Sequence, residues 1–222
     1  MKMKLKSSTK FRKRFKLNIK LNKKNIFIFL ISFLIISFIS GIIFYLNLNL
    51  NDKSIINKNI NSYFVLKDSY NYISLFLKSN FNNIFNTGIT WLLGISIIGI
   101  ALVLFIFFSS FFSLGFSISA IISIYGIKGI VISFCYLLFS KILVLLNTFI
   151  ITFFAINISI KLFKACFLKD EINIKEEIRK YNKILLFCLC LSIISSIFEV
   201  FIDPFMIKIY QMIIWQVLLN NV

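Results

Sequence analysis

The chain has 222 residues, of which 59% are hydrophobic and only 15% charged, and its formal net charge is +17. A soluble domain of this length has too little interior to bury so much apolar surface, so the sequence predicts a membrane protein. The chain contains no histidine, which excludes serine–histidine–aspartate and cysteine–histidine catalytic sites and metal sites built on histidine.

Residues 1–24 form a basic arm with eleven lysine or arginine residues and no acidic residue. The positive-inside rule predicts that this arm lies in the cytoplasm. A charge-free run over residues 25–46 follows and is long enough to cross a bilayer. No A-x-A-like cleavage site follows it, which favours an uncleaved signal anchor over a signal peptide. Attraction to anionic lipid explains the arm more economically than nucleic-acid binding does.

The segment 54–80 is polar but carries an apolar stripe at helical spacing. We expect one amphipathic helix here, outside the cell. Two interpretations stay open and are compatible: an interfacial helix on the bilayer surface, and a docking surface for an extracytoplasmic partner. The stripe consists of Ile56, Ile60, Tyr63, Tyr70, Ile73 and Leu77.

No charged residue occurs between Lys78 and Lys128. As helix, this stretch of 49 residues would be about 74 Å long, against a hydrocarbon core of about 30 Å. We therefore expect two crossings, over residues 84–107 and 111–127, with a turn around residues 108–115.

The segment 129–140 is too short to cross, so we expect a half-helix or re-entrant stretch that ends at Lys141. A further span follows over residues 142–160. The connector 161–183 holds seven lysine or arginine residues, which places it in the cytoplasm. Five spans satisfy this placement and leave the C-terminus outside.

The last span, residues 184–202, carries a polar face. It consists of Ser192, Ser196, Glu199 and Asp203, spaced by four, three and four residues. An ionisable residue inside a membrane usually faces the bundle, so Glu199 should point inward. It either lines a transport or proton pathway or makes an interhelical hydrogen bond near the outer surface, where Pro204 is expected to end the helix. Lys128 and Lys141 either pair with it or snorkel to the surface.

Small residues at a spacing of four mark a packing groove where another backbone can approach closely. The candidate packing or partner-binding residues are Gly94, Gly99, Gly115, Ser119, Ser123, Gly126 and Gly129. The cysteines (Cys135, Cys166, Cys188 and Cys190) form no C-x-x-C pattern. The pattern predicts no catalytic constellation, cofactor or metal.

The predicted fold class is all-α: a polytopic bundle of about five transmembrane helices, with a short half-helix and amphipathic interfacial helices. Its parts are the arm 1–24, a membrane domain 25–206 that includes the outer helix and the connector, and an outer interfacial tail over 207–222.

The stretches "WLLGISIIGI" (91–100), "FFSLGFSISAIISIYGIKGI" (111–130) and "FEVFIDP" (198–204) resemble the stage II sporulation protein M family in sequence and order. This family consists of five-span membrane proteins of endospore-forming bacteria. The family pattern tends to have proline where this chain has Ala101 and the Ser140–Lys141 pair. The resemblance covers residues 26–206.

The resemblance implies a non-enzymatic scaffold that acts during engulfment at the mother cell's septal and engulfing membrane. It implies partners similar to stage II sporulation proteins D and P, which degrade peptidoglycan, besides the lipid bilayer. No nucleic-acid partner is expected, and self-association is left open. The alternative is a small transporter or channel component that uses the Glu199 face.

Overall fold

The computed structural model describes residues 23–64, 71–134, 139–168 and 173–219, and these ranges are almost entirely helical. In chain order the elements are α2 (Lys23–Leu46), α3 (Leu50–Phe64), α4 (Tyr72–Gly94), α5 (Gly99–Tyr125), α6 (Ile127–Ser133), α7 (Phe139–Phe163), the π-helical turn η2 (Lys164–Leu168) and α8 (Ile174–Leu219). No strand occurs within them. The arm over residues 1–22 lies outside the described residues.

Four helices of the described chain are long and apolar enough to cross a membrane: Lys23–Leu46, Gly99–Tyr125, Lys141–Phe167 and Ile174–Phe201. The 24 residues of α2, for example, span about 36 Å, slightly more than a hydrocarbon core. The prediction of an all-α polytopic membrane bundle is confirmed. α4 is as long as α2 but more polar, and it packs inside the same bundle against α7 and α8.

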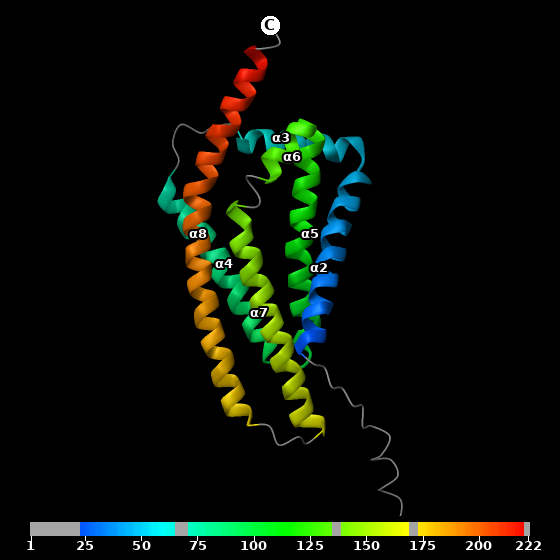
Figure 1. The fold of residues 1–222 in the computed structure, drawn as a ribbon, viewed down its shortest axis with the longest axis vertical. Coiled ribbons are helices and arrows are strands. Elements are labelled where there is room, and N and C mark those ends of the chain that lie inside the picture. Colours follow the sequence, from blue (N-terminus) through cyan, green and yellow to red (C-terminus); the bar gives the residue numbers. More distant parts are fainter. Residues whose placement is uncertain (1–22, 65–70, 135–138, 169–172, 220–222) are drawn as a thin grey trace, which may run out of the picture.

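The long helices alternate in direction (Figure 1). α2, α5 and α8 run one way, and α4 and α7 run back between them. The short helices α3 and α6 lie together at one end, which we call the α3 end. The start of α2, the end of α7 and the start of α8 lie at the opposite end, which we call the basic end.

The predicted turn at residues 108–115 is wrong, because these residues lie inside the continuous helix α5. The chain turns instead between Gly94 and Gly99, where the N–H groups of Ile95 and Ser96 donate to carbonyls of the last turn of α4 at 3.2 and 3.0 Å. Ser159 of α7 donates its hydroxyl to the carbonyl oxygens of Gly94 (2.6 Å) and Ser96 (3.1 Å). A serine of the neighbouring helix thus binds the free carbonyl groups of the turn. The turn can therefore form in an apolar sequence, without polar side chains of its own.

A single outer helix over residues 54–80 is also wrong. α3 is one helix, and α4 begins separately at Tyr72 after Asn71, whose side chain accepts a hydrogen bond from the N–H of Ser74 at 3.3 Å. An asparagine in this position is a standard helix N-cap. Residues 65–70 lie outside the described residues. The second half of the predicted outer helix therefore belongs to a helix of the bundle.

Two glycines fold α6 back onto α5. Gly126 has φ +59° and ψ −138°, a conformation that side chains rarely adopt. A Cβ on Gly129 would lie 2.7 Å from the carbonyl oxygen of Ile121 in α5, so only glycine permits this approach. A short helix was expected over residues 129–140; it begins slightly earlier, and residues 135–138 lie outside the described residues.

Pro204 does not end the last helix. The backbone of α8 continues through it to Leu219, and residues 220–222 lie outside the described residues. Proline removes one backbone N–H donor but does not by itself stop a helix that extends on both sides. The expected separate tail over 207–222 is, as far as residue 219, the continuation of α8.

The interface of α2 with α5 is a close backbone contact. A Cβ on Gly115 would overlap the carbonyl oxygen of Phe38, and one on Gly41 would overlap that of Phe112. Phenylalanine rings pack on either side of this contact, including Phe44 with Phe112 at 5.5 Å between ring centroids. Small residues that admit a neighbouring backbone are the usual means of tight helix packing in lipid.

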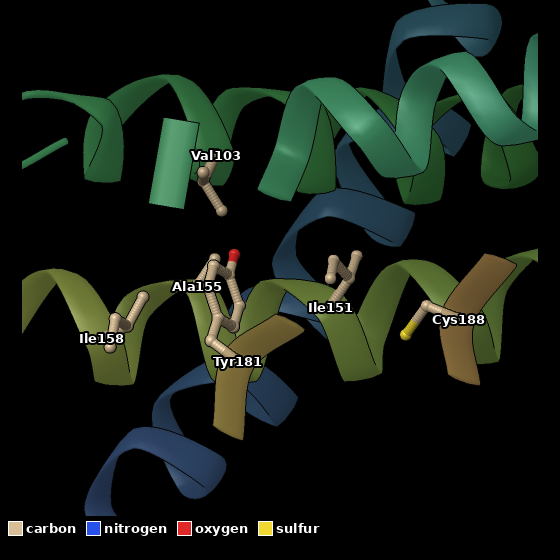
Figure 2. Packing of buried hydrophobic residues seen from close by; sticks show 6 residues of the cluster. All are labelled: Val103, Ile151, Ala155, Ile158, Tyr181 and Cys188. Carbon is tan, nitrogen blue, oxygen red and sulfur yellow. The ribbon is translucent and has the colours of Figure 1, made fainter. Parts of the chain in front are cut away.

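A second core joins α5, α7 and α8. It consists of Val103, Ile151, Ala155, Ile158, Tyr181 and Cys188. Figure 2 shows the Tyr181 ring lying beside Ala155. The Tyr181 hydroxyl donates to the carbonyl oxygen of Trp91 in α4 at 3.2 Å, so this core also holds the end of α4.

We predict that Gly41→Ala and Gly115→Ala each destabilise the bundle, because the added methyl group has to push α2 away from α5. Gly88→Ala is the matched control: apart from its chain neighbours and the backbone of its own helix, no atom lies within 4 Å of its Cβ position. We expect this control to stabilise α4 by about 0.5–1 kcal/mol through helix propensity. Unfolding by SDS titration in mixed micelles measures all three. Equal effects at the three sites would contradict the proposed packing.

Candidate functional site

The most unusual feature of the bundle is a line of polar side chains between α4, α7 and α8. On α4, Ser79, Asn83 and Thr87 follow one another at intervals of four residues, which places them on one face of the helix. This face packs against α8. A polar stripe buried in a membrane bundle requires partners on the facing helix.

α8 supplies those partners from Ser192, Ser195 and Ser196, all of which are fully buried. The side-chain amide of Asn83 donates to the hydroxyl of Ser196 at 3.1 Å and, less closely, to that of Ser195 at 3.4 Å. One turn along, the hydroxyls of Thr87 and Ser192 lie 3.0 Å apart. The two stripes therefore interlock side chain by side chain.

Asn147 brings α7 into the same network. It is only 4% exposed, and its amide nitrogen donates to Thr87 Oγ1 and to Ser192 Oγ, both at 2.9 Å. Ser192 in turn donates to the carbonyl oxygen of Cys188 within α8. One side chain thus fixes three helices at one level of the bundle.

The network ends toward the α3 end in an ion pair. The Glu199 carboxylate accepts a hydrogen bond from Ser79 of α4 and pairs with the ammonium group of Lys141 of α7. The Glu199 side chain is 11% exposed and that of Lys141 39%, so the lysine reaches the pair from the edge of the bundle. We call the whole set the polar seam: Ser79, Asn83, Thr87, Lys141, Asn147, Ser192, Ser195, Ser196 and Glu199.

Most polar groups of the seam bind one another, but the buried side-chain oxygen of Asn147 has no hydrogen-bond partner among the described residues. The Glu199 carboxylate pairs with Lys141 and accepts a hydrogen bond from Ser79, so its contacts join α8 to α7 and α4. The serines of α8 donate to carbonyl oxygens of their own helix, as in Ser195 and Ser196 to Ser192. Among the described residues, no group of three His, Cys, Asp or Glu side chains is placed to hold a metal ion.

The structure brings together four of the predicted polar residues: Ser192, Ser196 and Glu199 lie on one inward face, and Lys141 pairs with Glu199. The side chains of Lys128 and Asp203 lie outside the described residues. Glu199 joins α8 to Ser79 of α4 and Lys141 of α7 near the α3 end of the bundle.

The predicted small residues lie in several places. Gly115 faces α2, Gly94 packs against Ala155 and Tyr181, and Gly99 lies close to the Leu93 carbonyl in the α4–α5 turn. Ser119 is half-buried and Ser123 exposed. Gly115 is therefore not open to a partner helix, because α2 of the same chain occupies it.

Sequence reasoning missed the α4 side of the seam and Asn147. The signal was present, since Ser79, Asn83 and Thr87 recur at intervals of four. The two predicted elements, an outer helix that ended at residue 80 and a span that began at residue 84, separated this repeat into two parts, so its common face was not recognised. Asn147 is a single polar residue in an apolar run, and only the fold shows what it faces. Gly41, four residues after the buried Ser37, was missed in the same way.

We predict that Asn147→Leu lowers the free energy of unfolding by about 1–2 kcal/mol, because Thr87 and Ser192 lose a shared donor. Asn157→Leu is the matched control on the same helix, since the Asn157 amide donates only to the Phe153 carbonyl of α7. SDS titration monitored by tryptophan fluorescence compares the two. A cost at Asn157 as large as that at Asn147 would mean that the interhelical bonds contribute nothing.

We also predict that Glu199→Ala is more destabilising than Glu199→Gln, by about 1 kcal/mol. The glutamine oxygen still accepts from Ser79, whereas alanine leaves both Ser79 and Lys141 without this partner. The same titration measures the difference. If both variants and the unmodified protein had the same free energy of unfolding, Glu199 would contribute nothing to the stability of the seam.

Comparison with protein families gives one match. The model described as stage II sporulation protein M matches residues 25–204, which contain the whole of α4, α5 and α7, the α2–α5 contact and the polar seam. Comparison with curated proteins and with solved structures found no match. The match covers most of the 222 residues and agrees with the resemblance seen in the sequence. The chain therefore belongs to the stage II sporulation protein M family.

Proposed function

We propose that this sporulation-related membrane protein is a non-enzymatic scaffold for the engulfment machinery. In this proposal it anchors peptidoglycan hydrolases, similar to stage II sporulation proteins D and P, at the septal and engulfing membrane of the mother cell. The observation that carries the proposal is the family match over residues 25–204. The use of the seam's side chains for helix packing supports it.

The proposed orientation places the basic end of the bundle in the cytoplasm. Residues 1–24 carry eleven basic residues and the segment 161–183 seven, and Figure 1 places the start of α2, the end of α7 and the start of α8 at the same end. Basic segments next to membrane spans are retained on the cytoplasmic side. The α3 end then faces the side where peptidoglycan lies.

The proposed docking surface is α3 and not the glycine groove. Gly115 already contacts α2, as described above, and a partner helix would have to displace it. α3 exposes apolar side chains, with Leu50 84% and Ile55 59% exposed, beside the exposed charges of Asp52 and Lys58. An amphipathic surface of this kind suits both an interfacial position and protein contact.

The test is a pull-down of the tagged full-length chain from detergent-solubilised membranes of a sporulating host during engulfment. We predict that peptidoglycan hydrolases are recovered, as identified by mass spectrometry. The variant Asp52→Ala with Lys58→Ala should reduce their recovery severalfold. The control, Lys175→Ala with Glu176→Ala, makes the same change at the basic end and should not.

Two outcomes would contradict the proposal. Recovery of a transport ATPase or permease without any hydrolase would contradict the scaffold role. Ion or proton flux in reconstituted vesicles that is lost in Glu199→Gln would favour the transporter alternative. Loss of engulfment in Asp52→Ala with Lys58→Ala, without any flux, would agree with the scaffold.

A further inference from the structure

A cavity of about 200 Å³ opens between α2, α7 and α8 at the basic end of the bundle. No part of the polar seam lines it, so it is a separate feature of the fold. Its lining residues are Lys23, Phe154, Asn157, Ile158, Lys161, Glu177, Lys180, Tyr181 and Ile184.

The lining changes from apolar to charged along the helix axes. On α7, Phe154 and Ile158 come first, and Lys161 follows nearer the basic end. On α8, which runs the opposite way, Lys180 lies nearer the basic end and Ile184 deeper in the bundle. The cavity therefore has apolar walls at bilayer depth and a charged rim toward the membrane surface.

The rim has an excess of positive charge, with three lysines in the lining against the single carboxylate of Glu177. Glu177 pairs with Lys161 and lies 3.8 Å from Lys180, and Glu176 holds Lys180 from outside the cavity at 2.8 Å. These pairs fix the direction of two ammonium groups, and Lys23 at the start of α2 adds the third. With Glu176 counted beside Glu177, the three lysines leave one net positive charge at the rim, and this charge favours an anion at the membrane surface.

We propose that this cavity binds an anionic phospholipid. The headgroup phosphate lies among Lys23, Lys161 and Lys180, and an acyl chain follows the apolar wall of Phe154, Ile158 and Ile184. Basic pockets between membrane helices at the cytoplasmic surface are suited to anionic headgroups. Lysine contacts phosphate as a point charge and its stem packs on apolar surface. The inference rests on the membrane position of the bundle and on the proposed cytoplasmic orientation of its basic end, but not on the proposed scaffold function.

The test uses native mass spectrometry of the full-length protein in detergent, with added phosphatidylglycerol or phosphatidylcholine. We expect preferential retention of phosphatidylglycerol. Lys23→Gln with Lys180→Gln should weaken that retention by roughly fivefold for each lysine removed. Both side chains are exposed, so the variant should fold, and its thermal unfolding in lipid-free detergent checks this.

The control is Lys24→Gln with Lys183→Gln. These exposed lysines lie on the same two helices, close in sequence to the tested pair, but do not line the cavity. Unchanged retention in the control supports a specific site. Equal loss in both variants, or no preference for phosphatidylglycerol, would overturn the proposal. If inorganic phosphate raised the thermal stability of the protein as much as phosphatidylglycerol does, the ligand would be a free anion and not a lipid.

Discussion

The hydrogen bonds between α4 and α8 are the interaction on which the rest of the bundle depends. A helix with serine, asparagine and threonine at every fourth position is costly in lipid unless those groups find partners. Asn83 meets Ser195 and Ser196, and Thr87 meets Ser192, while Asn147 connects this level to α7. The polar face of α4 therefore specifies where it lies, and its apolar residues complete the bundle.

The position of α4 determines the direction of every helix after it. Because α4 returns the chain, α5 and α8 run parallel to α2, and the start of α2, the end of α7 and the start of α8 come to the same end (Figure 1). The cavity at that end is lined by Lys23 of α2 together with Lys161 and Lys180 from the far half of the chain. The polar seam, the proposed orientation and the proposed lipid site are thus linked by one element.

Sequence reasoning succeeded where water or charge marks a boundary. The bounds of α2 follow from the lysines before it and the asparagines after it, and the inward direction of Glu199 follows from the cost of burying a carboxylate. It failed where groups of another helix, and not water, bind the polar groups of the backbone. The α4–α5 turn lies in apolar sequence because Ser159 satisfies its carbonyls, and α8 continues through Pro204 because one missing donor does not stop a long helix. The pairing of the polar face of α4 with that of α8 depends on contacts between residues far apart in the sequence. Local periodicity does not predict such contacts.

The proposed orientation requires that α4, which is not among the four long apolar helices of the described chain, crosses the membrane as a fifth span. Cysteine labelling tests this central claim most directly. In a chain whose native cysteines are replaced, Leu50→Cys at the start of α3 and Ile98→Cys in the α4–α5 turn place single thiols at residues 84% and 82% exposed. Intact cells are treated with a membrane-impermeant maleimide, with Ile127→Cys (86% exposed) as a second probe of the α3 end. If α4 crosses, Leu50→Cys and Ile127→Cys are labelled in intact cells, and Ile98→Cys is labelled only after the cells are permeabilised. Labelling at 50 and 98 under the same condition would show that α4 does not cross.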